Sequence, residues 1–431
     1  MNDSRTLVEH YFRHEYGRLV AVLTRSLGVR NFELVEDVVQ STLSNAIQVW
    51  GQKGIPGNPS AWLYKTSRNL AIDALRRTQV EHRLLQSGFL EINVTEDLDL
   101  SVQLDGEIGD EPLRLLCLCC HPQIPLEASI AFALKNVSGF NIDEVATALL
   151  ISKSNAEKRV SRAKTKLREL GIELTEINAT AFESRLEAVQ SCIYLLFNEG
   201  YASAIGHSSI RKELCEEAIR LTRMLIRSTQ SSMPSTAALL ALLLLHSARF
   251  NARVNADGAI ILLEDQDRLL WDWNRIREAM SWMAHSAEGP QLSRYHVEVA
   301  IAWEHCRAKT FKEVDWQSIF DHYKVLNQIQ PSPMVQLNLA IATSYASNLE
   351  SGLKHLVQIP AAGRARIRPW WDCAIADVFY RLGNVEHAIS HWRDAILLTT
   401  NSDHRELIVN RIRNAKQKTP FDQSKGVSSL N

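Results

Sequence analysis

The chain has 431 residues, 45% of them hydrophobic and 23% charged, and its formal net charge is −1. These values are ordinary for globular proteins and leave room for two to four domains, at roughly 150 residues each. A net charge near zero excludes a globally basic chain, so any nucleic-acid site must be local. The most apolar run, Ala237 to Leu245, is too short for a membrane span of about 20 residues, and no secretory leader is recognisable. We therefore expect a cytoplasmic protein without membrane contact, whose seven unpaired cysteines are reduced.

The first predicted domain covers residues 5 to 83 and contains two or three helices, a Gly/Pro loop and a further long helix. Its segment FELVEDVVQSTLSNAIQVW predicts a helix with an inward stripe of Leu34, Val38, Leu43, Ala46, Ile47 and Trp50. Another face of that helix carries polar residues only: Glu36, Asp37, Gln40 and Ser44. This face is either plain solvent-exposed surface or a docking surface for a partner protein.

The stretch PSAWLYKTSRNLAIDALRR, Pro59 to Arg77, predicts one amphipathic helix with Ser60 as its N-cap. Its buried stripe consists of Leu63, Leu70, Ala71, Ala74 and Leu75. The other faces carry Trp62, Tyr64, Lys65, Ser67, Arg68, Asn69, Asp73, Arg76 and Arg77. Basic groups neutralise phosphates, aromatic rings stack on exposed bases and amides read base edges, so this surface suits nucleic acid. The alternative is an ordinary amphipathic helix with a solvated basic face.

An acidic segment follows, with no lysine or arginine between Leu84 and Leu113. It holds Glu91, Glu96, Asp97, Asp99, Asp105, Glu107, Asp110 and Glu111. Because such a run repels itself and is poor in core-forming residues, we expect a mostly extended linker over residues 84 to 112. An acidic strand of this kind also suits a positively charged channel in a partner.

Residues 113 to 172 predict a second small helical domain. Leu126 to Leu134 forms one helix, and NIDEVATALL forms a shorter one with Asn141 and Glu144 placed as in a capping box. After a turn, SKSNAEKRVSRAKTKLREL predicts a helix with Ala156, Val160, Ala163 and Leu167 inward. Its seven basic residues outnumber its two glutamates, which gives a net charge of +5. Two short helices joined by a tight turn, the second basic, are typical of a helix-turn-helix; a charged surface helix is the alternative.

The segment LCLCCHP groups Cys117, Cys119, Cys120 and His121. Zinc ligands usually occur as two pairs, each separated by two to four residues, and here the second pair is missing. A thiol-rich helix end is therefore favoured over a zinc site, and we predict no metal and no cofactor.

Residues 180 to 416 predict a larger domain that is helical throughout. Expected helices include 182 to 198, 266 to 284 and 370 to 381, and several others pair through short turns. AIADVFYRLGNVEHAISHWRDAILLT has the alternation of small and large residues of a tetratricopeptide unit. We expect an array of stacked helices with a concave face for a partner.

Two stretches interrupt this helical pattern. NEGY, Asn198 to Tyr201, ends the first helix of the domain, and DGAIILLEDQDRLLWD runs from Asp257 to Asp272. The second stretch gathers carboxylates near an aromatic residue, as in some metal or sugar sites. Caps and ion pairs that fix a turn between helices would explain the same residues. No phosphate-binding glycine loop or HExxH-like spacing accompanies them.

Taken in order, these segments resemble bacterial sigma-70-type initiation factors of the extracytoplasmic-function group, in particular the subgroup with a C-terminal tetratricopeptide-like extension. EDVVQSTLSNAIQVW resembles the segment that docks on the polymerase β′ coiled coil. NPSAWLYKTSRNLAIDALRR resembles the segment that melts and reads the −10 element, and NIDEVATALLISKSNAEKRVSRAKTKL resembles the −35 helix-turn-helix. The resemblance implies an all-α fold: two small sigma domains joined by an acidic linker and followed by the extension.

The resemblance also implies roles for particular residues. Polymerase would bind at Leu34, Asp37, Val38 and Gln40. The −10 element would contact Trp62, Tyr64, Lys65, Arg68, Asn69, Asp73 and Arg76. The −35 element would contact Lys153, Ser154, Asn155, Lys158, Arg159 and Arg162. The motifs of the extension would be Asn198, Glu199, Gly200, Tyr201, Asp257, Gly258, Asp265, Gln266, Asp267 and Arg268. DGAI departs from the DGG or DGD start of such extensions at Ala259.

The predicted function is to direct core RNA polymerase, through its β′ and β subunits, to specific promoter DNA, without covalent chemistry. The extension would regulate this step and would have a protein or ligand partner of its own. Two alternatives stay open at this point. One is a helix-turn-helix repressor with a sensor domain, and the other is a metal-dependent helical enzyme that uses Asp257, Asp265 and Asp267.

Overall fold

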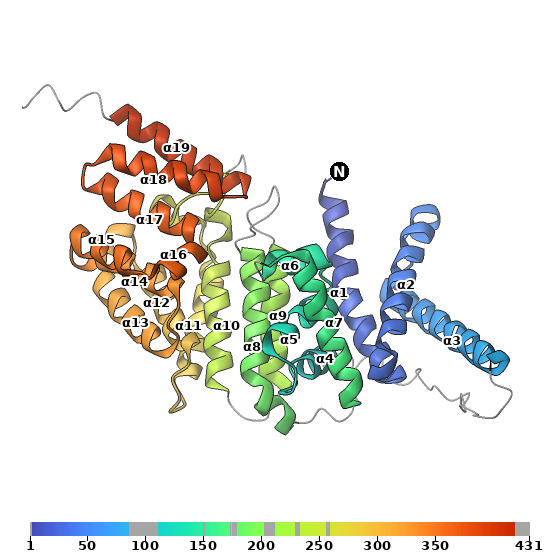
Figure 1. Ribbon diagram of the computed structural model, residues 1–431. Coiled ribbons are helices and arrows are strands. Elements are labelled where there is room, and N and C mark those ends of the chain that lie inside the picture. Colours follow the sequence, from blue (N-terminus) through green and yellow to red (C-terminus); the bar gives the residue numbers. More distant parts are fainter. Residues whose placement is uncertain are drawn as a thin grey trace, which may run out of the picture. The chain divides into compact units, whose positions relative to one another are not determined.

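The computed structural model describes residues 2–85, 111–149, 151–172, 174, 179–201, 212–228, 233–255 and 259–418. Within these ranges it contains nineteen α-helices and no β-strand, apart from an isolated bridge between Val254 and Ile260 (Figure 1). The predicted all-α fold is therefore confirmed. The acidic linker predicted over residues 84 to 112 lies almost wholly outside the described residues. No helix in the described ranges is long and apolar enough to span a membrane.

The chain divides into two compact units, which are described separately. The first comprises Met1–Leu196 and Arg220–Ser231, and the second comprises Phe197–Ile219 and Ser232–Asn431. Helices of the first unit are α1 (Asn2–Leu27), α2 (Phe32–Lys53), α3 (Pro59–Leu85), α4 (Glu111–Cys119), α5 (Leu126–Asn136), α6 (Ile142–Ala148) and α7 (Lys153–Leu170). Two helices, α8 (Ala179–Tyr201) and α9 (Lys212–Ser228), contribute residues to both units.

The core of the first unit is built from the apolar stripes of its helices. Leu19, Val20 and Leu23 of α1 are buried, and α1 ends just before Gly28, whose positive φ of 79° suits glycine. Phe32 at the start of α2 meets Phe132 of α5, with ring centroids 5.0 Å apart. The first three helices therefore share a core with the helices that follow the linker.

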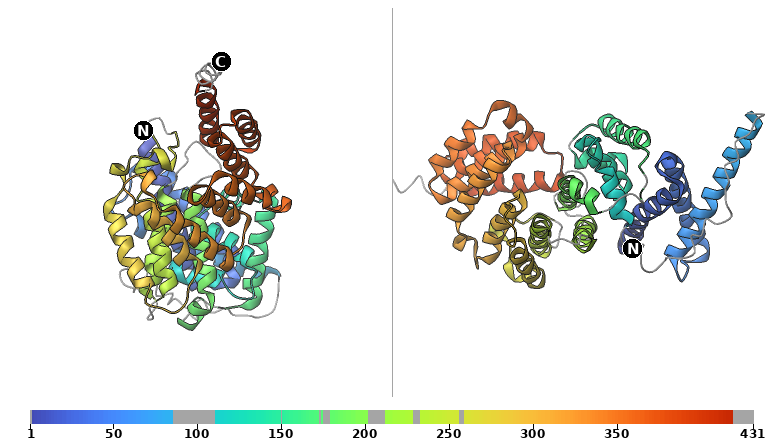
Figure 2. Two further views of the ribbon diagram at one scale, coloured as in Figure 1. Left: turned by 90° about the vertical axis from the view of Figure 1, so that its left-hand side faces the viewer. Right: turned by 90° about the horizontal axis from the view of Figure 1, so that it is seen from below.

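The second unit is a run of short helices, coloured yellow to red in Figure 2. They are α10 (Pro234–Ser247), α11 (Trp273–Ser286), α12 (Arg294–Arg307), α13 (Trp316–Ile329), α14 (Pro333–Ala346), α15 (Leu349–Gln358), α16 (Ala361–Arg366), α17 (Arg368–Arg381), α18 (Val385–Leu398) and α19 (Ser402–Lys418). Successive helices such as α14 and α15, or α17 and α18, pack against each other.

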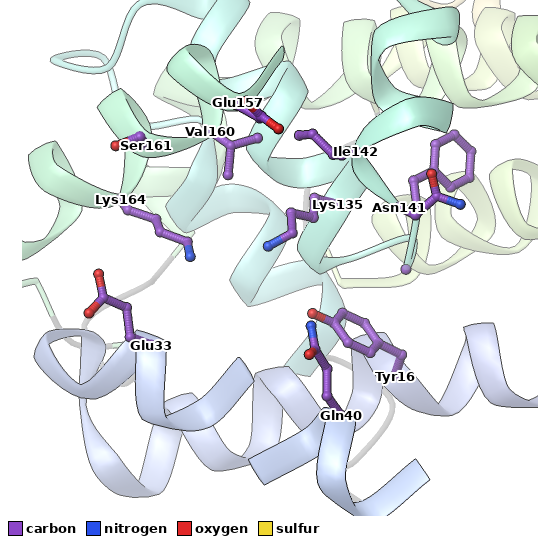
Figure 3. A pocket seen from close by; sticks show the side chains of 12 residues that line it. Tyr16, Glu33, Gln40, Lys135, Asn141, Ile142, Glu157, Val160, Ser161 and Lys164 are labelled. Atoms are coloured by element: carbon purple, nitrogen blue, oxygen red, sulfur yellow. The ribbon is translucent and has the colours of Figure 1, made fainter. Parts of the chain in front are cut away.

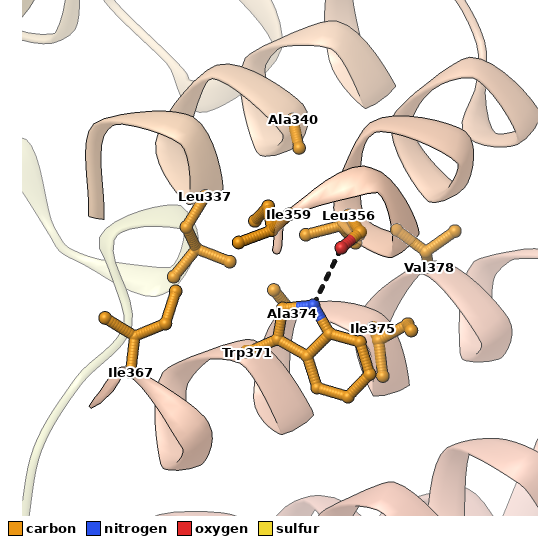
Figure 4. Close-up of a cluster of buried hydrophobic side chains, with 9 residues drawn as sticks. All are labelled: Leu337, Ala340, Leu356, Ile359, Ile367, Trp371, Ala374, Ile375 and Val378. Carbon is orange, nitrogen blue, oxygen red and sulfur yellow. Dashed lines mark hydrogen bonds between the residues drawn. The ribbon is translucent and has the colours of Figure 1, made fainter. Parts of the chain in front are cut away.

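Apolar clusters between these helices hold the second unit together. One cluster joins α14, α15 and α17 around Leu337, Leu356 and Trp371 (Figure 4). The indole N–H of Trp371 donates to the carbonyl oxygen of Leu356 at 2.9 Å, so the ring is buried with its polar atom paired. Burial of each large side chain of this kind stabilises the array by roughly 1.5–3 kcal/mol.

Three local predictions need correction. The helix expected from residue 266 begins only at Trp273, because the carboxylate of Asp272 caps the backbone N–H groups of Asn274 and Arg275. Helix α3 begins at Pro59, and the side chain of Asn58, rather than that of Ser60, accepts from the N–H of Ala61. The third concerns Ile47, which was expected to point inward.

Ile47 of α2 is 63% exposed. It follows Glu36 by three turns and so shares its face of the helix. The helices that cover Glu36 leave this end of α2 open.

Candidate nucleic-acid and partner interfaces

An exposed polar stripe runs along α3. Lys65, Asn69, Asp73 and Arg76 are all exposed, and their spacing of four, four and three residues places them on one helix face. Trp62 lies one turn before Lys65 on the same side and is half-buried. Four of the predicted −10 contacts are therefore accessible on a single surface.

The aromatic residues of α3 are less free than the sequence suggests. The ring of Trp62 meets the edge of Trp50 at 5.5 Å, and Trp50 stacks on Phe12 at 5.5 Å. Burial raises the pKa of Tyr64, an effect opposed by the nearby charge of Arg68. The rings of Trp62 and Tyr64 therefore pack partly against the protein beside the exposed stripe of α3, and each keeps part of its surface exposed.

Ser67 was expected on a wet face of α3, and this was wrong. It is fully buried, and its hydroxyl donates to the carbonyl oxygen of Tyr64 at 2.9 Å. A serine that satisfies its hydroxyl within its own helix can occupy a core position as a small residue does. Leu63 and Ala71, the neighbours predicted for the stripe, are buried as expected.

The predicted polymerase-binding residues lie on two sides of α2. Asp37 and Gln40 are both exposed, and Gln40 lies one turn after Glu36, where it lines the edge of the contact with α5 to α7. Leu34 is half-buried and Val38 is buried. Polymerase binding at these residues stays a prediction.

Glu36, expected on the same polar face, has a different role. Only 7% of its side chain is exposed, and its carboxylate pairs with Lys135 of α5 at 2.6 Å and with Lys164 of α7. A weaker pair joins Glu33 to Arg168 of α7 at 3.6 Å. One acidic face of α2 is thus a contact with the helices predicted to bind the −35 element.

A groove of about 580 Å³ lies beside this contact, between α1 and α2 on one side and α5 to α7 on the other (Figure 3). Lys135 and Lys164 point toward α2, while Tyr16 and Gln40 enter from below. Burial raises the pKa of Tyr16, and the charge of Glu36 adds to the effect. The groove therefore places a predicted polymerase contact, Gln40, next to the helix-turn-helix.

Helices α6 and α7 form as predicted. Asn141 and Glu144 make both hydrogen bonds of a capping box, and Ser152 caps α7 by accepting from the N–H of Asn155. All four predicted inward residues of α7, Ala156, Val160, Ala163 and Leu167, are buried. The left-handed Gly171 ends the helix.

Four of the predicted −35 residues, Asn155, Lys158, Arg159 and Arg162, lie on the side of α7 away from Lys164 and its contact with α2, whereas Lys153 lies three turns before Lys164 on the same side. Lys153, Ser154, Asn155, Lys158 and Arg162 are exposed, and Arg159 is half-buried. Two of the cations have local partners: Lys153 pairs with Asp143 at 3.0 Å and Arg159 with Glu127 at 2.8 Å. Since such surface pairs contribute about 0–1 kcal/mol, they exchange readily for phosphates.

The cysteine-rich segment forms the end of α4. Cys117, Cys119 and Cys120 are buried, and the sulfurs of Cys120 and Cys192 lie 3.7 Å apart. Burial raises the pKa of the Cys117 thiol to about 12. These thiols pack as small apolar groups, as the favoured interpretation of the sequence holds.

The motif residues of the extension lie in the second unit, except for Asp257 and Gly258, which are outside the described residues. The NEGY motif ends α8, where Glu199 and Gly200 are buried and Asn198 is half-buried. The ring of Tyr201 packs against His246 at 5.1 Å and carries the guanidinium of Arg253 at 3.8 Å.

The second motif forms a turn held by its polar residues. The buried Gln266 donates to the carbonyl oxygen of Ile261 and accepts from Arg249. Asp267 accepts from the N–H of Leu269, and Arg268 donates to the carbonyl oxygens of His305 and Ala308 at 2.5 and 2.7 Å. These contacts favour the interpretation of the stretch as caps that fix a turn.

Asp265 and Asp267 of this turn are exposed, and Asp257 lies outside the described residues. In the described part of the chain, three metal-type ligands lie within reach of one another elsewhere: Asp372, His391 and Asp394. Arg368 already pairs with Asp372 at 2.9 Å there. The described part of the turn therefore gives the metal-dependent enzyme no support.

Sequence reasoning missed two sets of residues. The contacts of Lys135 and Lys164 with α2 were not predicted from the sequence. A buried acid such as Glu36 requires a cation, and these two lysines supply it. Around the extension motifs, His246, Arg249, Arg253 and His305 also went unnoticed. Three basic residues within eight positions, His246, Arg249 and Arg253, at and just after the end of the mostly apolar α10, were the available signal.

Comparison with known proteins identifies two segments. Residues 11–80 match the sigma-70 region 2 family, and residues 185–287 match a family of unknown function, DUF6596. Uncharacterized protein R00370 of Rhizobium meliloti (strain 1021) is 37% identical over 384 residues, which cover 88% of this chain and 89% of that protein. No solved structure matches the chain. The chain therefore belongs to the same family as this relative, and its region 2 domain marks it as a sigma-70-type factor of transcription initiation.

Proposed function

We propose that this chain is a sigma factor of the extracytoplasmic-function group that brings core RNA polymerase to promoters with two separate DNA readers. The observation that carries the proposal is the exposed stripe of Lys65, Asn69, Asp73 and Arg76, because it lies inside the segment that matches sigma-70 region 2. Helix α3 would read the −10 element and α7 the −35 element.

The two readers divide the work of recognition. On α7, Lys158 and Arg162 supply phosphate contacts that give affinity, while Ser154 and Asn155 at its start reach base edges. On α3, Asn69 and the half-buried Trp62 suit bases that have left the duplex, since an unstacked base can pack on an aromatic ring. Capture of such bases favours strand opening.

Polymerase would bind α2 at the exposed Asp37 and at Gln40 beside the groove, with its β′ subunit as the partner, and the linker would run along the β subunit. The second unit would regulate initiation. Its turn around Gln266 and Arg268 belongs to the segment that matches DUF6596. We propose that a regulatory partner acts on the second unit at this turn.

Run-off transcription with core polymerase, on DNA from upstream of the protein's own gene, tests the proposal. A transcript should require the chain and should disappear in the double variant Asn69→Ala, Arg76→Ala. The matched control is Lys53→Ala, an exposed basic residue at the end of α2. A transcript that survives the double variant would refute α3 as a reader.

A pull-down of core polymerase separates the remaining outcomes. Polymerase binding without a transcript would mean that the promoter fragment is wrong. Tight, specific duplex binding in the absence of polymerase would favour the repressor instead. Loss of binding for Asp37→Ala with Gln40→Ala, at unchanged helix content, would support these residues of α2 as the docking site.

A further inference from the structure

Three arginines of the second unit gather around the extension motifs without a carboxylate partner. They are Arg249 and Arg253, which follow α10, and Arg268 of the motif turn. Among the described residues, none of the three forms an ion pair with an aspartate or glutamate. All three are half-buried. Guanidinium groups stay charged at any physiological pH, so this site holds three positive charges, and the carboxylate of Glu313 acts on Arg268 only from beyond ion-pair distance.

Aromatic rings fix the guanidinium groups in place. Arg253 lies 3.8 Å above the ring of Tyr201, and Arg268 and Arg249 lie 4.6 Å and 5.6 Å from the ring of Trp271. Stacking orients the planar groups, and although Nη1 of Arg268 and Nε of Arg249 already donate within the protein, Nη2 of Arg268 and Nη1 of Arg253 have no partner among the described residues. The arginines therefore form a pre-oriented set of donors.

Five buried polar atoms around the arginines have no hydrogen-bond partner within the part of the chain that the structure describes. Three are N–H donors: Nη1 of Arg253, Nη2 of Arg268 and Nε1 of Trp271. The other two, Nδ1 of His246 and of His305, donate or accept according to the tautomer. Buried polar atoms are nearly always paired, because an unpaired one costs about 1–3 kcal/mol, so the three donors favour a ligand that supplies acceptors.

The two histidines belong to the same positive environment. Burial first, and then the nearby Arg249, Arg253 and His305, lower the pKa of His246 to about 3. Burial first, and then the charges of Arg249 and Arg268, also lower the pKa of His305 to about 3. Both rings are therefore neutral, and an anion between them and the arginines would relieve the repulsion.

We propose that the site formed by Arg249, Arg253, Arg268, His246 and His305 binds a small molecule through a phosphoryl group. A dianionic phosphoryl group matches the excess of positive charge and supplies several strong acceptors, which a single carboxylate does not. The site lies around Tyr201 and Arg268, so binding would order the turn that carries the extension motif.

Calorimetric titration of the full chain tests the proposal without polymerase, so its outcome is independent of the proposed promoter function. The probes are inorganic phosphate and a nucleoside monophosphate, with chloride at matched ionic strength as the reference. We expect saturable binding of at least one of the two. The stronger one identifies the source: the free ion or a phosphate ester. No saturable heat at millimolar concentration of either probe would overturn the proposal.

The variant Arg253→Gln removes one guanidinium that has no protein hydrogen bond at Nη1. Binding should weaken roughly tenfold or more, since a hydrogen bond to a charged group is among the stronger ones. The control is Arg277→Gln, an exposed arginine of α11, which should bind as the unchanged chain does. Equal affinity of the two variants would overturn the proposed site, provided that both fold by circular dichroism.

Discussion

Replacing Glu36 with glutamine should loosen the contact between α2 and the helix-turn-helix. The change keeps the shape of the side chain but leaves Lys135 and Lys164 without their shared carboxylate. Removing one partner of a fully buried ion pair costs about 3–5 kcal/mol. Because the two lysine side chains are 21% and 18% exposed, water can compensate part of this, and we expect about 2 kcal/mol.

Hydrogen exchange of the full chain, followed by mass spectrometry, measures this cost locally. A loss of about 2 kcal/mol corresponds to roughly 30-fold faster exchange of α7 amides that open with the contact. Glu33→Gln is the control, since Glu33 is 67% exposed and 3.6 Å from Arg168, and it should change exchange less than about twofold. Equal exchange of α7 in the two variants would refute the role assigned to Glu36.

Three further predictions concern packing, pH and thiols. Gly17→Ala should destabilise the first unit, because a Cβ there would lie 2.0 Å from the carbonyl oxygen of Val137. Gly51→Ala meets nothing within 4 Å and should stabilise α2 by up to about 1 kcal/mol. The denaturant midpoints of both variants measure these changes. His246 and His305 have a folded pKa of about 3, below an unfolded value near 6.5, so only the unfolded chain gains their protons as pH falls between these values. Stability should drop by up to about 1.4 kcal/mol per histidine and pH unit, and unfolding curves of His246→Gln should show a smaller drop. Burial raises the pKa of the Cys119 thiol, so iodoacetamide at pH 8 should label it in the unfolded chain long before the folded one.

Helical periodicity predicted most of the fold. All four predicted inward residues of α7 are buried, whereas in α2 only Val38 and Ala46 of six are buried, and in α3 only Leu63 and Ala71 of five. The spacing defines which side of a helix can enter a core, but not how deeply each residue is buried. The capping box at Asn141 was equally clear, since both of its hydrogen bonds form within four residues. Local rules therefore sufficed wherever the deciding contacts are local.

Contacts between distant segments account for what the sequence left open. Glu36 looks like any acid on a polar face until Lys135 and Lys164, 99 and 128 residues away, are known to reach it. The N-cap of α3 could have been predicted correctly from the sequence. Proline favours the first helical position, so Pro59 indicates Asn58, not Ser60, as the cap. The arginine site requires α10, the motif turn and α12 together, and no spacing in the sequence announces it.

The bridge from Glu36 to Lys135 and Lys164 also has a consequence for affinity. Elements centred at −10 and −35 are about 25 base pairs apart, so readers bound to both are separated by roughly 85 Å along the duplex. If α3 and α7 act as the proposed readers, α2, which packs against α3, could not stay in contact with α7 through Glu36 over that length, so the contact would have to break before both readers bind. Its free energy would then be subtracted from recognition: a contact of about 2 kcal/mol would lower the apparent affinity for a two-element promoter about 30-fold and would leave binding to either element alone unchanged.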